Sequence, residues 1–206
     1  MWEIENRTPF AASGTFKRDL TGAEVWIVII KASFDILPDG AVKDSEKQSE
    51  PSHLRNQSVP NIKYKKFKKQ LNPAGFGVIS CHWQPRASYG GTYDEKWEKT
   101  QNPFLPKDFD IKYYQHAPED QQIKGYLKGG EQVNLKNLHP DGDLTFKLPK
   151  LRINCLTVID KTDIEHRPNL HTVIIEPDDN KLIMVWHTAL PCHKKEHLLK
   201  KTKIRL

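Results

Sequence analysis

A chain of 206 residues fits one domain, and its five Trp, six Tyr and eight Phe exclude disorder throughout. Three scattered cysteines exclude a disulfide framework and, with no secretory leader visible at the start, favour a reducing compartment. The net charge of +6 permits attraction to nucleic acid, anionic lipid or an acidic protein without choosing among them. The longest apolar run, 25–30, is far short of the roughly 20 residues that span a bilayer, so we expect a soluble, cytoplasmic protein without a membrane partner.

The strongest strand signal lies at 24–36, where β-branched and aromatic residues dominate, and the Pro-Asp-Gly turn at 38–40 ends it. The segment 43–59 is polar, has little that could be buried, and predicts a linker. The segment 60–70 alternates lysines with aromatic residues and predicts a basic arm. We expect these segments to separate an N-terminal strand unit from a larger body within one β-rich domain, 1–206.

Strand signals recur in the second part of the chain, and helical signals are few. A hairpin is predicted from strands at 171–176 and 181–190, joined by the sequence Pro-Asp-Asp-Asn. Thr92 to Glu95 resembles a helix N-cap with an acidic first turn and predicts a short helix to about residue 98. Other predicted elements are strands at 77–83, 144–148, 151–160 and 201–206, a single turn at 106–109, and either a helical turn or an edge strand at 193–200.

These signals together predict a mainly β protein, either all-β or α+β. We expect an antiparallel sheet or sandwich with one or two short helices, because fourteen prolines and eleven glycines favour short strands joined by turns. Three tryptophans fall within predicted strands and are expected in the core: Trp26, Trp83 and Trp186.

The segment 73–142 combines glycine, proline, aromatic and acidic residues at high density, and so predicts a series of turns that present side chains. Trp2 and Trp97 are the tryptophans best suited to a partner surface. Because loops carry function more often than core strands, we select partner-binding candidates from this segment. They are Tyr93, Asp94, Trp97, Gln121, Gln122 and Tyr126.

Three other kinds of site have weaker support. Cys81, His82, Cys192, His193 and His197 lack the paired close spacing of a structural zinc site, so no metal is expected. A hydrolase-like site would require His82, Asp94 and His187 to converge in space. A nucleic-acid site would use the basic arm, but no recognised module accompanies its residues, which are Lys63, Tyr64, Lys65, Lys66, Phe67, Lys68 and Lys69.

Several short motifs, taken in order, resemble a bacterial family known as domain of unknown function 2169. They are NRTPF at 6–10, KASFD at 31–35, PNI at 60–62, PAGFG at 73–77, GTYD at 91–94, DQQ at 120–122, GGE at 129–131, VIIEPD at 173–178 and LPC at 190–192. The resemblance covers both ends of the chain and most of its body.

Members of this family are encoded beside type VI secretion components, which include the VgrG spike, PAAR tips and toxic effectors. The resemblance therefore implies a cytoplasmic adaptor or chaperone that holds an effector and helps to load it onto the spike. It implies no enzymatic activity and no cofactor.

The chain departs from the family pattern in its middle. Typical members carry a long β-rich segment between the FDI strand and the PNI motif, where this chain has only 41–59. The resemblance thus implies a reduced sheet, in either a natural short form or the product of an internal deletion in a decaying gene. A reduced sheet leaves unpaired strand edges that a partner must cover if the protein is to avoid aggregation.

Overall fold

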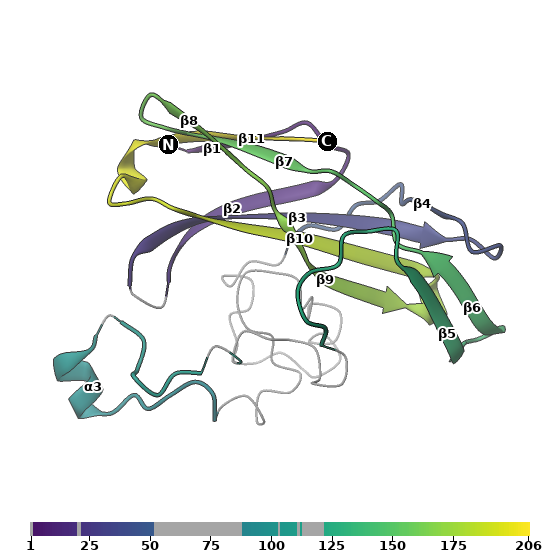
Figure 1. Ribbon diagram of the computed structural model, residues 1–206, viewed down its shortest axis with the longest axis horizontal. Helices are drawn as coiled ribbons and strands as arrows, with labels where there is room; N and C mark the ends of the chain where they lie inside the picture. Colours follow the sequence, from purple (N-terminus) through teal and green to yellow (C-terminus); the bar gives the residue numbers. More distant parts are fainter. Residues whose placement is uncertain (1, 20–21, 52–87, 103, 111, 113–121) are drawn as a thin grey trace.

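The computed structural model describes residues 2–19, 22–51, 88–102, 104–110, 112 and 122–206. In this part of the chain, two β-sheets lie in layers and a separate β-hairpin covers one end (Figure 1). The prediction of a mainly β, antiparallel architecture is confirmed. No helix among these residues is long or apolar enough to cross a bilayer.

The larger sheet is built around β3 (Glu24–Ile36), whose bounds match the predicted strand. Antiparallel β10 (Lys181–Pro191) pairs along one side of it, and β9 (Asn169–Glu176) pairs with β10. The other side of β3 is shared by β2 (Ala11–Arg18) and β4 (Val42–Asp44). The predicted β9–β10 hairpin is therefore confirmed.

The smaller sheet has the order β1 (Glu3–Asn6), β11 (Leu199–Arg205), β7 (Asn154–Ile159) and β8 (Thr162–His166). All its pairs are antiparallel except β1 with β11, which run parallel. A separate hairpin joins β5 (Gln132–His139) to β6 (Gly142–Lys147).

The predicted strands at 144–148, 151–160 and 201–206 correspond to β6, β7 and β11, with shifted ends. In the segment 193–200, the helical-turn alternative is present as the 3-10 turn η5 (Glu196–Leu198), which leads into β11. The edge-strand alternative is wrong, because β11 lies between β1 and β7. The sequence did not predict β1, β2, β4, β5 or β8, and the strand expected at 77–83 lies outside the described residues.

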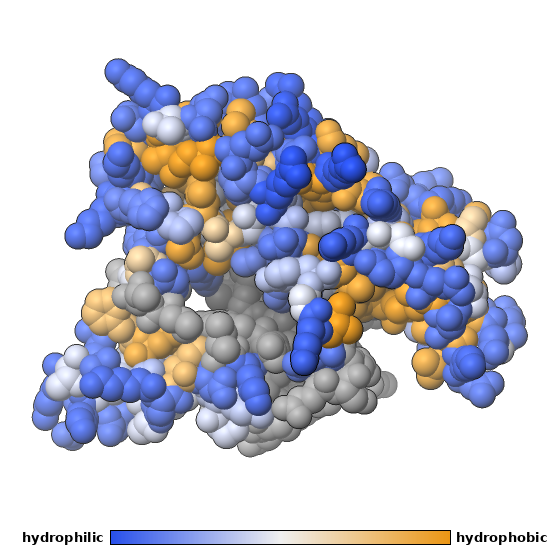
Figure 2. All heavy atoms as spheres, in the orientation of Figure 1, coloured by the Kyte–Doolittle hydropathy of each residue, from blue (hydrophilic) through white to orange (hydrophobic). Residues whose placement is uncertain are grey.

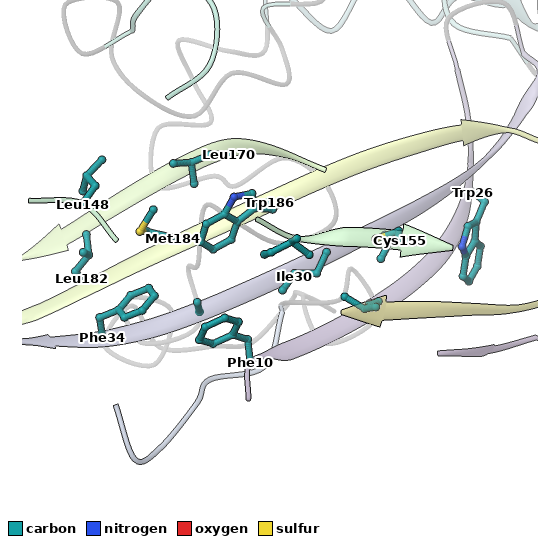
Figure 3. Packing of buried hydrophobic residues seen from close by; sticks show 14 of the residues in the cluster. Phe10, Trp26, Ile30, Phe34, Leu148, Cys155, Leu170, Leu182, Met184 and Trp186 are labelled. Carbon is teal, nitrogen blue, oxygen red and sulfur yellow. The ribbon is translucent and has the colours of Figure 1, made fainter. Parts of the chain in front are cut away.

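The main core fills the space between the layers (Figure 3). Trp26 is fully buried and Trp186 is 5% exposed, which confirms the prediction that both anchor the core. Trp83 lies outside the described residues. Because alternate residues of β3 face this core, its other residues form a second face, where Ile29 and Val185 make a smaller apolar cluster. Both faces of β3 are therefore buried.

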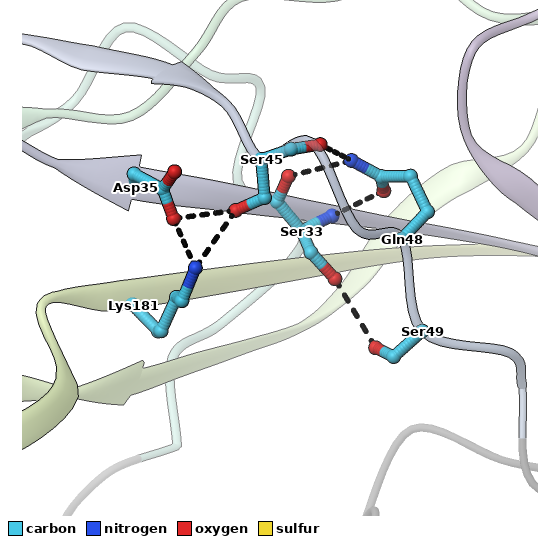
Figure 4. A network of polar contacts seen from close by, with 6 residues as sticks. All are labelled: Ser33, Asp35, Ser45, Gln48, Ser49 and Lys181. Carbon is cyan, nitrogen blue, oxygen red and sulfur yellow. Dashed lines mark hydrogen bonds and ion pairs between the residues drawn. The ribbon is translucent and has the colours of Figure 1, made fainter.

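The segment predicted as a polar linker, 43–59, begins instead as part of the sheet edge. Val42–Asp44 forms β4, and the Gln48 amide then bonds to both backbone groups of Ser33, at 2.8 Å to its N–H and 2.9 Å to its carbonyl oxygen (Figure 4). Lys181 bonds to Asp35 beside this contact. Polar side chains thus attach the first part of this segment to β3, where apolar side chains are absent. Residues 52–59 and the basic arm lie outside the described residues.

Candidate functional site

The only α-helix in the described part of the chain is α3 (Glu95–Thr100), close to its predicted position. The Asp94 carboxylate accepts a hydrogen bond from the Trp97 backbone N–H at 2.7 Å, and so caps the helix N-terminus. The Glu98 backbone N–H bonds to the Asp94 carbonyl oxygen at 2.9 Å. The helix is short, so this cap fixes where it begins.

The loops that flank α3 are joined to one another. The Thr92 backbone N–H and hydroxyl donate to the Asp108 carboxylate at 3.1 and 2.7 Å, and these bonds lower the pKa of Asp108. The Asp110 N–H donates to the Tyr89 carbonyl oxygen at 2.9 Å. The predicted turn at 106–109 is present, with the Phe109 N–H bonded to the Pro106 carbonyl oxygen. Helix α3 therefore lies within a loop whose two ends are joined by hydrogen bonds.

Three aromatic side chains gather on this closed loop, and we call Tyr93, Trp97 and Phe104 the aromatic surface. The rings of Tyr93 and Trp97 meet edge to face, with centroids 4.7 Å apart. The Trp97 indole N–H donates to the Phe104 carbonyl oxygen at 2.9 Å. Tyr93 is 56% exposed and Phe104 is 46% exposed. Figure 2 shows a small apolar patch among hydrophilic side chains over this unit, at the lower left.

Phe104 also ties the aromatic surface to the sheet. A Cβ atom placed on Gly22 would lie 2.0 Å from the Phe104 ring, and Gly22 has a φ of +81°. Only glycine fits both the backbone angle and the close approach. Gly22, just before β3, therefore packs against the ring, and this contact joins the α3 unit to the body.

The structure brings together three of the six predicted partner-binding residues: Tyr93, Asp94 and Trp97. Gln122 and Tyr126 are exposed but belong to another segment, which leads into β5 and lies apart from α3 (Figure 1). The neighbouring Leu127 forms a bridge to Leu170 at the start of β9. Gln121 lies outside the described residues.

The hydrolase-like alternative assigned chemistry to His82, Asp94 and His187. The Asp94 carboxylate is occupied as the helix cap. His187 lies on β10 with its ring 5.6 Å from that of His171, and burial together with that neighbouring imidazole lowers the pKa of His187 to about 4. His82 lies outside the described residues. Asp94 and His187 therefore have separate local environments.

The described residues contain no group of three His, Cys, Asp or Glu side chains placed to hold a metal ion. Cys155 and Cys192 are free and buried, and burial raises the pKa of Cys155 to about 12, so it remains a protonated thiol. Cys81 and the lysines of the basic arm lie outside the described residues.

Sequence reasoning missed Phe104. No local pattern singles out this residue, because its importance arises from a carbonyl oxygen that meets Trp97 and a ring that meets Gly22. Trp2, the other tryptophan considered for a partner surface, is 42% exposed and packs edge to face on Trp26 at 4.7 Å. Its ring therefore covers the end of the core.

Comparison with known proteins gives one match. The model of a family described as an uncharacterized protein conserved in bacteria (DUF2169) matches residues 40–187, a range that includes the aromatic surface and Tyr126. No curated protein and no solved structure matches the chain significantly.

Proposed function

Because the chain belongs to the DUF2169 family of bacterial proteins, we propose that it is a non-catalytic cytoplasmic adaptor or chaperone for a type VI secretion effector. In this role it binds the effector and aids its loading onto the VgrG or PAAR spike protein. The motif resemblance suggests this role, and the aromatic surface formed by α3 and its flanking loops is the observation that supports it best.

The aromatic surface has the properties of an interface anchor. Tryptophan and tyrosine are enriched among the residues that dominate binding energy, since each buries a large area with few rotatable bonds. The indole N–H of Trp97 already has a partner in the Phe104 carbonyl oxygen. Burial beneath a client would therefore leave no unpaired indole donor, and the usual cost of covering a polar group is avoided.

Charged residues of both signs surround this surface. Glu95 and Lys99 form an exposed pair on α3 at 3.4 Å, and the helix also carries Lys96 and Glu98. An apolar centre with a polar, solvated rim is the usual arrangement of a protein interface. A stable complex would bury upwards of about 1,000 Å² in total, so the client must also contact residues beyond these three aromatics.

The same proposal covers the middle of the chain, where the long β-rich segment expected of typical family members is replaced by residues 41–59. We regard the chain as a working short form, because the described part of the segment that stands in its place completes the sheet. β4 pairs with β3, and the Gln48 side chain bonds to the next residue of β3, Ser33. A chance deletion would instead leave this edge unpaired and prone to aggregate.

The test is co-expression of the tagged chain with the effector encoded beside it. We expect a soluble complex and a lower yield of soluble effector when the chain is omitted. The Tyr93→Ala/Trp97→Ala double variant should lose the complex, whereas Leu138→Ala, which removes a 63%-exposed apolar side chain on β5, should retain it. Equal recovery of the effector with the parent chain and with both variants, or no complex with any of the three, would contradict the proposal.

A further inference from the structure

A series of side-chain hydrogen bonds crosses the core between the two sheets, and His166 of β8 lies within it. The Trp26 indole N–H donates to the Thr202 hydroxyl at 2.9 Å, and that hydroxyl lies 2.7 Å from the Thr157 hydroxyl. Each ring nitrogen of His166 then meets one threonine, with Nε2 at 2.8 Å from Thr157 and Nδ1 at 3.1 Å from Thr188 on β10. Because Trp26, Thr157 and Thr202 are fully buried, every donor in the series needs an acceptor within the protein.

The direction of each hydrogen bond follows from the indole, which can only donate. The Thr202 hydroxyl accepts from Trp26, and in the described part of the chain its own proton has one acceptor within reach, the Thr157 oxygen. The Thr157 hydroxyl must then donate to Nε2 of His166, and Nδ1–H donates to the Thr188 oxygen. The series is therefore complete when His166 is neutral and carries its proton on Nδ1.

A second proton on His166 conflicts with this direction. Nε2–H would have to donate to the Thr157 oxygen, and the Thr157 hydroxyl would then turn to the Thr202 oxygen. The Thr202 proton would be left without an acceptor among the described residues, at a position that is fully buried. A buried donor without an acceptor is unfavourable, and so is a buried charge without a counter-ion.

The described strands around His166 supply no such counter-ion. Directly opposite it in the β7–β8 ladder is Cys155, a buried thiol whose pKa is raised to about 12, so it stays neutral. Glu165, the neighbour of His166 on β8, points to the other face of the strand and pairs there with Arg205 at 3.6 Å. Burial is accordingly the cause that lowers the pKa of His166.

The other strands of the two sheets direct their titratable side chains away from the ring, because side chains alternate along a strand. Glu24 is on the core-facing side of β3, but it lies at the start of that strand, beside Cys192. The residues on the far faces are His187 on β10, His171 on β9, Lys201 and Lys203 on β11, and Glu3 and Glu5 on β1.

We propose that His166 acts as an acid-sensitive switch between the two sheets. The neutral ring completes the series that joins β8 to β10 and β11 to β3, and a second proton breaks this series, so the smaller sheet loosens from the larger one. Because burial lowers the pKa of His166, the unfolded chain takes up this proton at a higher pH than the folded chain does. The contact is therefore intact at neutral pH and weakens as the pH falls below the range of an exposed histidine. This inference does not depend on the proposed adaptor function.

The readouts are the tautomer of His166 and the exchange of the Trp26 indole N–H, both followed by NMR on the intact chain. At pH 7.5 we expect the ring nitrogen shifts of a neutral Nδ1–H tautomer. The protection factor of the Trp26 indole N–H corrects for the intrinsic pH dependence of exchange. It should fall by roughly tenfold or more as His166 titrates between pH 7.5 and 4.5, since a buried donor then lacks its acceptor.

Two single substitutions separate His166 from the other buried histidine. His166→Gln keeps one acceptor and one donor at this position but cannot titrate, so it should abolish the fall in Trp26 protection. His187→Gln is the matched control, because it removes a buried histidine from the opposite face of β10 and should leave the fall in place.

Three results would overturn the inference. One is an Nε2–H tautomer of His166 at pH 7.5, and another is Trp26 protection that stays constant while His166 titrates. The third is a fall in protection that disappears in His187→Gln and persists in His166→Gln. If His166→Gln does not fold, the first two measurements, made on the parent chain, still decide the matter.

Discussion

The indole N–H of Trp26 in β3 donates a hydrogen bond to the hydroxyl of Thr202 in β11, at 2.9 Å, and joins the two sheets through the core. The Thr202 hydroxyl lies 2.7 Å from that of Thr157, which lies 2.8 Å from the His166 ring. The other His166 nitrogen lies 3.1 Å from the Thr188 hydroxyl on β10. A series of linked side-chain hydrogen bonds thus runs from the larger sheet through the smaller sheet and back to the larger one.

Replacing Thr202 with valine tests this series of hydrogen bonds. The change keeps the shape of the side chain but leaves the Trp26 N–H without an acceptor in a site that is fully buried. An unsatisfied buried donor costs about 1–3 kcal/mol, so the free energy of unfolding should fall by that amount in urea titrations. Thr162→Val, at the exposed start of β8, is the matched control and should change stability by less than about 0.5 kcal/mol. Equal effects of the two substitutions would show that these hydrogen bonds make no specific contribution to the free energy of unfolding.

Stability should also depend on pH through His187. Burial, reinforced by His171, lowers its pKa from 6.5 to about 4. The unfolded chain therefore binds a proton near pH 6.5 that the folded chain does not accept until about pH 4. The free energy of unfolding is greatest above pH 7 and decreases as the pH falls through this window, by on the order of 3 kcal/mol for this group.

Burial also lowers the pKa of His166, so its contribution has the same sign. Urea unfolding at pH 7.5, 6.0 and 5.0 measures the dependence. His187→Gln should make it shallower. A stability that stays constant between pH 7.5 and 5.0 in the parent chain would refute the assignment.

Gln48 is predicted to hold the segment after β4 on the sheet. Its amide bonds to the N–H and the carbonyl oxygen of Ser33, a residue that is 6% exposed. Gln48→Ala leaves that N–H unsatisfied and should cost about 1–3 kcal/mol. Amide exchange at Ser33 should become faster than in Lys47→Ala, a change at the exposed neighbouring position. Unaltered exchange at Ser33 would mean that the glutamine does not protect this edge.

The sequence predicted β3 and the β9–β10 hairpin because their signals are local. β3 has a continuous β-branched run, and Asn180 adopts a left-handed φ of 51° in a turn rich in proline and aspartate. β2 was not predicted, since its sequence AASGTFKR has no continuous β-branched run and contains Gly14. Its real role is tertiary, since a Cβ at Gly14 would lie 2.4 Å from the Trp26 ring. β1 was missed for a similar reason, because it pairs with a strand at the opposite end of the chain.

Polarity was misleading in residues 43–51, the described part of the segment 43–59 that the sequence predicted as a linker. Its hydrogen bonds to Ser33 arise only once β3 has formed, so composition alone could not reveal them. In the candidate site, Asp94 and the start of α3 were predictable from capping rules. The pairing of Trp97 with Phe104 depends on how the loop closes, and so lay beyond sequence reasoning.

The helix cap gives a further prediction. Asp94→Ala removes the acceptor of the Trp97 N–H and should destabilise α3 by about 1 kcal/mol, seen as faster amide exchange at Trp97. Asp94→Asn and Asp94→Ser retain a capping oxygen and should largely preserve the helix. If Asp94→Ala and Asp94→Ser have equal exchange at Trp97, the carboxylate has no capping role.

The most direct measurement is the affinity of the purified chain for its effector by isothermal titration calorimetry, with the parent chain, Tyr93→Ala/Trp97→Ala and Leu138→Ala. Aromatic anchors at the centre of an interface contribute about 2 kcal/mol or more each, so the double variant should bind at least 100-fold more weakly. Leu138→Ala should bind as the parent chain does. An unchanged dissociation constant for a folded Tyr93→Ala/Trp97→Ala variant would contradict the assignment of the aromatic surface as the effector-binding site.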